Sequence, residues 1–118
     1  VETLVDFLDG DPALQRVTLR ALGEIGSQEA TQAVANCLDD ETDSVRSSAA
    51  RALGLLGDTR AIDPLADVLA EDDADEVRAS AAWGLRQIGT ERALEVAAEY
   101  ADDRSYVVQA EAEQATGA

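Results

Sequence analysis

Residues 45–57 read VRSSAARALGLLG, and residues 77–89 read VRASAAWGLRQIG, which is a close copy. A looser copy spans residues 14–26, and a fourth copy begins further along the chain. The first residues of the four copies lie 31, 32 and 30 positions apart: Leu14, Val45, Val77 and Val107. A fixed period of this length is typical of stacked helical repeats. The stretch at 45–57 therefore predicts a repeat array built from copies of one unit.

The composition suits such an array. Of the 118 residues, 46% are hydrophobic but only 3% are aromatic, so Ala, Leu, Val and Ile must form the core. Small side chains fill a single large core poorly, but in a repeat array each unit buries its apolar face on the next unit.

The chain is strongly acidic, with 25 acidic residues against nine basic ones and a net charge of −16. Such a surface repels phosphate backbones, which excludes nucleic-acid binding through a basic footprint. Two interpretations of the acidity remain open. The first is adaptation to concentrated salt, typical of a protein from a halophilic archaeon, because salt screens the repulsion between like charges. The second is a functional acidic face that binds a basic partner.

The residues that usually carry catalysis are missing from the sequence. The chain has no histidine and a single cysteine, Cys37, and it contains no glycine-rich phosphate loop. The acidic clusters at 39–41 and 72–73 lack the spacing of an EF-hand and are interpreted as helix caps. We therefore expect no catalytic residues, no cofactor and no metal site.

No apolar run approaches the ~18 residues of a membrane span, and no signal-peptide pattern is present. We expect a cytoplasmic protein that does not contact a membrane. The first residue, Val1, falls inside a helical pattern, which suggests a fragment of a longer array.

Apolar residues recur at helical spacing along the whole chain. They predict a helix at 1–9, helix pairs at about 13–40, 44–72 and 76–102, and a partial repeat at 104–118. Gly26, Gly57 and Gly89 are expected to end the first helix of each pair, and Pro64 fits a first helical turn. The residues expected to be buried are Leu4, Val5, Leu8, Leu14, Leu19, Leu22, Ile25, Ala30, Val34, Cys37, Leu38, Val45, Ala49, Leu53, Leu56, Ile62, Leu65, Leu69, Val77, Ala81, Leu85, Ile88, Leu94, Ala97, Ala98, Ala101, Val107, Ala112 and Ala115.

This pattern resembles the HEAT repeat family, specifically the short HEAT-like repeats named after phycobilisome lyases. The resemblance covers essentially the whole chain. It is carried by Val-Arg at 45–46 and 77–78, Ala-Leu-Gly at 21–23 and 52–54, the three stop glycines, and Gly-Asp at 57–58. It implies an all-α fold, a right-handed α-α superhelix (α-solenoid) of antiparallel helix pairs.

The resemblance also implies a bonding role for an aspartate that lies five positions before each copy. Asp40 and Asp72 would cap the turn between repeats and bond the arginines Arg46 and Arg78 of neighbouring repeats. Asp9 and Asp102 occupy the same position at the two ends of the array. The first copy has Gln15 in place of arginine and the last has Val108, so the arrangement is in question at both ends.

The resemblance implies that the first helix of each pair lines the convex side of the array and that the second helix lines the concave side. Aligning the second helices gives an acidic column of Glu2, Gln32, Asp63 and Glu95, and a parallel column of Asp6, Asn36, Asp67 and Glu99. A semi-apolar column runs beside them: Phe7, Cys37, Val68 and Tyr100. Carboxylates beside apolar side chains suit a basic peptide or a basic helix. The alternative is that these columns form an ordinary solvent-exposed helix face of an acidic protein, with no binding role.

Trp83 replaces Arg20 and Arg51 at the equivalent position of the first helices. An exposed tryptophan is a frequent interface anchor. The alternative is that the ring fills a groove left by small alanines on a neighbouring helix. Self-association through Trp83 or through the open ends of the array is a further expectation.

The function expected first is a non-catalytic scaffold that binds a protein partner on its concave face. The candidate contact residues are Asp63, Asp67, Trp83, Glu95, Glu99 and Tyr100. The resemblance implies two alternatives: a phycobilin lyase-like protein that handles a chromophore, and a regulatory or assembly segment of a larger multidomain protein. The family also includes a di-iron hydroxylase with His-Glu motifs, which a chain without histidine does not match.

Overall fold

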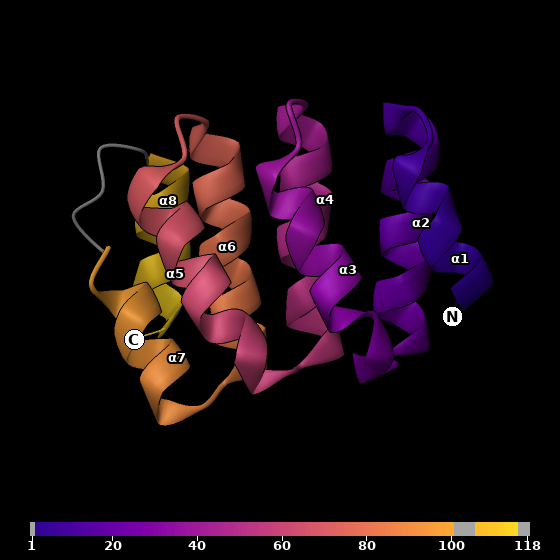
Figure 1. Ribbon diagram of the computed structural model, residues 1–118. Helices are drawn as coiled ribbons and strands as arrows, with labels where there is room; N and C mark the ends of the chain where they lie inside the picture. Colours follow the sequence, from indigo (N-terminus) through magenta and orange to yellow (C-terminus); the bar gives the residue numbers. More distant parts are fainter. Residues whose placement is uncertain (1, 101–105, 116–118) are drawn as a thin grey trace.

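The computed structural model describes residues 2–100 and 106–115, with the side chains of 4–100 and 108–115. It is all-α within these ranges, as predicted (Figure 1). One row consists of α2 (Pro12–Ile25), α4 (Asp43–Leu56), α6 (Asp75–Ile88) and α8 (Tyr106–Ala115). The second row is α1 (Glu2–Asp6), α3 (Thr31–Asn36), α5 (Ile62–Glu71) and α7 (Glu91–Ala98), extended by short 3-10 turns η1 (Phe7–Asp9), η2 (Gln28–Ala30), η3 (Cys37–Asp39) and η4 (Thr59–Ala61).

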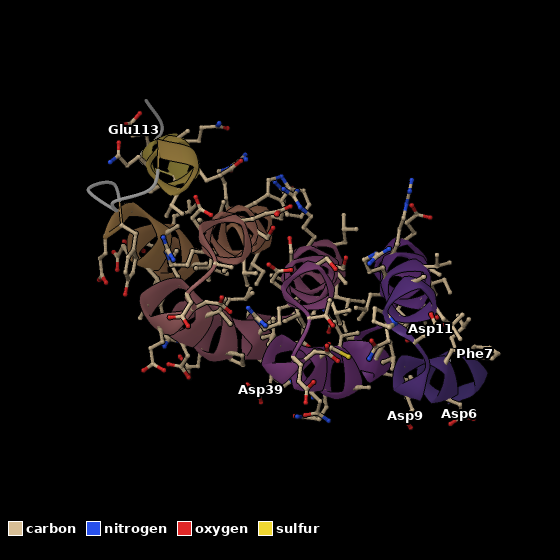
Figure 2. All side chains as sticks on the ribbon, turned by 90° about the horizontal axis from the view of Figure 1, so that it is seen from above. Asp6, Phe7, Asp9, Asp11, Asp39 and Glu113 are labelled. Carbon is tan, nitrogen blue, oxygen red and sulfur yellow. The ribbon has the colours of Figure 1, made fainter. Side chains whose placement is uncertain are left out.

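The helices stand side by side in an elongated array of 40 × 25 × 18 Å. Figure 2 looks along the helices and shows the two rows following one curve. The row of α2, α4, α6 and α8 lies on the inside of the curve, and the row of α1, α3, α5 and α7, which includes Asp39 at the end of η3, lies on the outside. We call them the inner row and the outer row.

This arrangement overturns the expected assignment of faces. The first helix of each pair, expected on the convex side, belongs to the inner row. The physical reason is the small residues along these helices. A Cβ added at Gly54 would lie 2.7 Å from the Cα of Gly84, and one added at Gly84 would lie 2.8 Å from the carbonyl oxygen of Ala50. Glycine therefore lets α4 and α6 approach backbone to backbone, and the more closely packed row forms the inside of the curve.

Three left-handed glycines end the inner-row helices, as the sequence predicted. Gly26, Gly57 and Gly89 have φ of 75°, 66° and 71°, and each donates its N–H to a carbonyl four residues earlier. Asp58 and Thr90 cap the following turn or helix through their side chains. Ser27, which precedes η2, makes no side-chain cap bond, and Asp43 and Ser44 lie within α4.

The core is one continuous seam between the rows. Most residues expected to be buried are buried, with Leu19, Leu53, Leu65, Leu69 and Leu85 fully inaccessible to solvent. Leu14 and Ile25 contradict the expectation, because they are 39% and 56% exposed. Their counterparts in the next repeat, Val45 and Leu56, are 0% and 5% exposed since α2 covers that side. In the described part of the chain, no helix covers the corresponding side of α2 beyond α1.

Smaller differences occur at the other end. Val108 on α8 is fully buried, although the sequence pattern did not select it. Ala93 is buried although the sequence pattern did not select it, while Leu94 and Ala98 are half-buried. Ala101 and Asp102 lie outside the described residues, as do the side chains of Glu2 and Val107.

Inter-repeat hydrogen bonds run through the aspartates that precede each copy. The Arg46 guanidinium donates to both oxygens of the Asp72 carboxylate, at 2.9 and 3.2 Å, and to the Asp40 carbonyl at 2.9 Å. Gln15 takes the same position one repeat earlier, donating to the Asp40 carboxylate at 3.0 Å and to the Leu8 carbonyl at 2.8 Å. We call these contacts the inter-repeat ladder. It continues into the first repeat, because an amide can make the bond that arginine makes elsewhere.

Each ladder aspartate also caps its own turn. Asp40 accepts from the Thr42 N–H at 2.9 Å, and Asp72 accepts from the Ala74 N–H at 2.9 Å. The helix-capping role expected of the clusters at 39–41 and 72–73 is thus reduced to turn bonds made by Asp40 and Asp72, since the N-caps of α4 and α6 make no side-chain cap bond. Arg78 donates to the Asp72 carbonyl at 2.7 Å and not to the Asp40 carboxylate.

Candidate functional site

A groove runs along the inner row between α2 and α4. It has a volume of about 430 Å³ and reaches Trp83 on α6. We call it the inner groove; its lining residues are Arg16, Val17, Arg20, Glu24, Ser48, Arg51, Ala52, Leu55 and Trp83. Except for Trp83, none of these was selected as a binding residue from the sequence.

Large apolar side chains are exposed along this groove. Val17 on α2 is 67% exposed and Leu55 on α4 is 49% exposed. Leu55 lies over Gly23, where an added Cβ would be 3.1 Å from Leu55 Cδ1. Exposed apolar residues that adjoin one another on a concave surface are typical of a binding site, whereas single ones are ordinary.

Trp83 takes a related position one repeat further along. Its Cζ3 atom would lie 3.1 Å from a Cβ at Gly54, so the ring fills the space that small residues leave beside α4. The Arg51 guanidinium lies over the ring, 5.0 Å from its centroid, which is a cation–π contact. The ring is half-buried, so it fills the seam and also contributes to the groove wall.

Three of the chain's nine basic residues line the inner groove: Arg16, Arg20 and Arg51. The single acidic residue among the lining residues, Glu24, forms an exposed ion pair with Arg20 at 3.1 Å. The local charge of the groove is therefore opposite in sign to the net charge of the chain. A signal for it was present in the sequence, because Arg16 and Arg20 lie four residues apart on a helix and share a face.

The residues predicted from the acidic columns lie on the outer row instead. Asp63 and Asp67 line an outer groove of about 500 Å³ between α3 and α5, together with Asp39 and Glu71. A second outer groove of about 470 Å³ lies between α1 and α3 and includes Asp6. The acidic columns therefore face solvent as expected, but on the convex side of the array.

The remaining candidates are more scattered. Asp63 forms an ion pair with Arg92 of the next repeat. Glu95 is exposed on α7 and Glu99 is exposed just after it, and neither lines the outer grooves. Tyr100 is half-buried and packs against the core. Trp83 lies on the opposite row, so the structure does not bring the six predicted contact residues together.

A buried carboxylate lies in the turn between α4 and α5. Asp58 is 4% exposed and accepts hydrogen bonds from the Thr31 hydroxyl at 2.8 Å and the Arg60 N–H at 3.0 Å. The Arg60 side chain pairs with the same carboxylate and reaches the Gln28 carbonyl. The hydrogen bond from the Arg60 side chain is the main cause that lowers the pKa of Asp58 well below its usual range. Asp58 thus links the turns of two adjacent repeats.

Replacing Asp58 by asparagine is expected to remove about 1 kcal/mol of stability at pH 7. Because the folded pKa lies below the unfolded value of about 3.9, the ionised carboxylate stabilises the fold above that value, and this contribution disappears as the pH falls toward the folded pKa. The difference in free energy of unfolding between the wild type and Asp58→Asn should therefore shrink below about pH 4. Urea denaturation at several pH values measures it. A difference that stays constant across this range would contradict the assignment.

Groups that could hold a ligand covalently or through a metal are scarce in the described residues. Cys37 is 8% exposed, and burial, with Asp40 and Asp9 nearby, raises the pKa of its thiol. Within residues 2–100 and 106–115, no group of three or more His, Cys, Asp or Glu side chains is arranged to hold a metal ion. In the same ranges, no helix has both the length and the apolar character needed to cross a bilayer.

The helices form an α-solenoid of helix pairs in which Val-Arg and Ala-Leu-Gly recur. This combination is typical of helical repeat proteins. The family model for HEAT repeats matches residues 1–86, and the model for the PBS lyase HEAT-like repeat matches residues 77–96. The chain belongs to the HEAT repeat family. The comparison with curated protein sequences gave no match.

Solved structures that are similar to this chain include a hydroxylase and a lyase complex. Human deoxyhypusine hydroxylase, solved in complex with glycerol, superposes with a TM-score of 0.84 at 28% identity over 98% of this chain. The complex of CpcE and CpcF of phycocyanin lyase from Nostoc sp. PCC7120 gives a TM-score of 0.74 at 27% identity over 94% of this chain and 72% of that chain. This chain spans 42% of the length of the hydroxylase chain.

Proposed function

We propose that this chain is a non-catalytic scaffold that binds a protein partner in its inner groove. HEAT repeats generally mediate protein interactions, and the CpcE–CpcF structure is a complex of two proteins. The observation that carries the proposal is the exposure of Val17 and Leu55 beside Trp83 on the concave side. Exposed aliphatic residues next to an aromatic ring and arginines match the composition of interface hot spots.

The residue types of the chain support a function without catalysis. The sequence has no histidine, and the pKa of its single cysteine thiol is raised by burial. Arginine, which lines the groove, binds and orients carboxylates but does not exchange protons near neutral pH. The inner groove is therefore suited to recognition.

A photo-crosslinking amino acid placed at position 55 tests this proposal against the outer row. A second variant carries the same group at position 67, which is exposed in the outer groove. In a lysate of the source cells, the variant at position 55 is expected to cross-link a discrete polypeptide, and the variant at position 67 is expected not to. Mass spectrometry of the cross-linked bands identifies the product.

Charge reversal supplies the control. Glu95→Lys with Glu99→Lys alters the outer row only, so cross-linking from position 55 should persist in this double variant. With the cross-linking group kept at position 55, Val17→Asp removes apolar contact in the inner groove and should abolish capture of the same polypeptide. Loss of cross-linking in the Glu95→Lys, Glu99→Lys double variant would show that the acidic columns, and not the inner groove, form the binding face.

The alternative function is a lyase-like role in handling a bilin chromophore. It is favoured by the likeness to the CpcE–CpcF complex, which covers most of both chains. A bilin held in the inner groove would stack on Trp83 and quench its fluorescence. Titration with a free bilin, followed by visible absorbance and by Trp83 emission, separates the two functions.

A further inference from the structure

We infer that the inner groove recognises an amphipathic helix whose apolar stripe is flanked by carboxylates. The inference rests on the proposed function and adds the chemical class of the partner. The sequence analysis expected a basic partner because it placed the acidic columns on the concave face. Those columns lie on the outer row, and the arginines of the inner groove favour an acidic partner instead.

The groove is linear and follows the helix axes. On α2 its wall consists of Arg16, Arg20 and Glu24, four residues apart, and on α4 it consists of Ser48, Arg51, Ala52 and Leu55 at helical spacing. Eight residues of α-helix span about 12 Å, so the groove matches roughly two turns of a helix laid along it. A docked helix presents apolar side chains at positions i, i+3 or i+4, and i+7, which would meet Val17, Leu55 and the Trp83 ring.

The guanidinium groups around the groove are available to a ligand. Arg16 donates to the neutral Ser44 hydroxyl at 3.2 Å. The pair of Arg20 and Glu24 is exposed, with 82% and 61% of the side chains accessible, so solvent screens it strongly. Arg51 stacks on Trp83 and makes no hydrogen bond to any residue in the described part of the chain. All three can therefore bind carboxylates on an incoming helix, with Arg51 held in place by the ring.

The net charge of −16 works against an acidic ligand at long range. At physiological ionic strength, however, the Debye length is about 8 Å, so distant carboxylates are largely screened. The charges that a docked helix meets directly are those of the groove, where arginines outnumber acids by three to one. A basic helix would place its cations against these guanidinium groups, which disfavours it.

A synthetic peptide of about 14 residues tests the inference. It carries leucines at positions i, i+3, i+4 and i+7 with glutamates beside them, and a hydrocarbon staple holds it helical because helices this short are marginal in water. The control peptide has lysine in place of every glutamate. Trp83 is the only tryptophan of the chain, so its fluorescence reports occupation of the groove. The glutamate peptide is expected to change the emission and the lysine peptide is not.

Three exposed positions sharpen the test without disturbing the core. Arg20→Glu should weaken binding of the glutamate peptide by about tenfold or more, and Glu24→Gln should strengthen it by about threefold since Arg20 loses its competing partner. Asp67→Lys on the outer row should leave binding unchanged. Circular dichroism verifies that each variant is folded.

Equal or tighter binding of the lysine peptide would overturn the inference, and so would unchanged binding by Arg20→Glu. These outcomes are distinct from failure of the proposed function. If position 55 cross-links a partner but the glutamate peptide does not bind, the groove is a protein-binding site and the acidic class is wrong. If position 55 cross-links a second copy of this chain, the inferred helix partner is also wrong, because the groove then forms a contact between copies.

Discussion

Arg46→Ala is expected to lower the free energy of unfolding by about 3 kcal/mol. The substitution removes both hydrogen bonds to the Asp72 carboxylate and leaves that carboxylate, whose side chain is 9% exposed, without a charged partner. It also frees the carbonyls of Asp40 and Glu41, which the same guanidinium group binds. Breaking a buried ion pair by removing one partner costs more than the pair contributes, because the remaining charge is left desolvated.

Urea denaturation followed by circular dichroism measures this loss. The matched control is Arg92→Ala, which breaks an ion pair with Asp63 whose side chains are 62% and 74% exposed. That variant should lose less than about 1 kcal/mol. Arg46→Gln imitates Gln15 of the first repeat and should recover part of the stability through an amide bond to Asp72. Equal losses for Arg46→Ala and Arg92→Ala would contradict the structural role of the inter-repeat ladder.

Gly84→Ala is expected to be destabilising by about 2 kcal/mol, the opposite of what helix propensity predicts. Alanine in place of a mid-helix glycine normally contributes about 1 kcal/mol of stability. Here the new Cβ would lie 2.8 Å from the Ala50 carbonyl oxygen, and a backbone atom cannot move aside as a flexible side chain can. The cost of overpacking, about 3 kcal/mol, therefore exceeds the gain in propensity.

Gly23→Ala is the control for this prediction. Its added Cβ would lie 3.1 Å from Cδ1 of Leu55, on an exposed side chain that can rotate away, and 3.2 Å from the Cα of Ala52, which needs only a small shift. Its effect on stability should lie near zero, since the gain in propensity offsets a small repacking cost. Thermal melts of the two variants side by side measure the contrast. If Gly84→Ala proved as stable as the wild type, α4 and α6 would not pack at this distance.

The fold was predictable from the sequence because repetition multiplies each signal. Val45, Leu53 and Leu56 recur as Val77, Leu85 and Ile88 at helical spacing, and the three stop glycines mark the ends of the inner-row helices. Leu14 and Ile25 fit the same pattern but are exposed. Periodicity identifies which residues share a face; whether another helix covers that face depends on what lies beside it in space.

The candidate site was less predictable for a related reason. Periodicity predicted that Asp63 and Asp67 share one face of a helix, yet it does not tell which row of helices lies inside the curve. Curvature depends on how closely neighbouring helices approach, and the relevant residues are Gly54 and Gly84, which contribute no side chain to any hydrophobic pattern. Val17 and Leu55 were overlooked because an apolar residue off the buried stripe of a helix is common and carries no periodic signal.

The exposed side of α2 has a consequence for local unfolding. Leu14 and Ile25 occupy positions that contribute full apolar burial in the second repeat, so within the described residues the first pair of helices has a neighbouring repeat on one side. In a linear array, stability is close to a sum over nearest neighbours, and a unit with one neighbour opens at lower free energy than a unit with two. In a polypeptide of residues 1–118, amide protons of α1 and α2 are therefore expected to exchange through local fraying, and those of α4 through unfolding of the whole array.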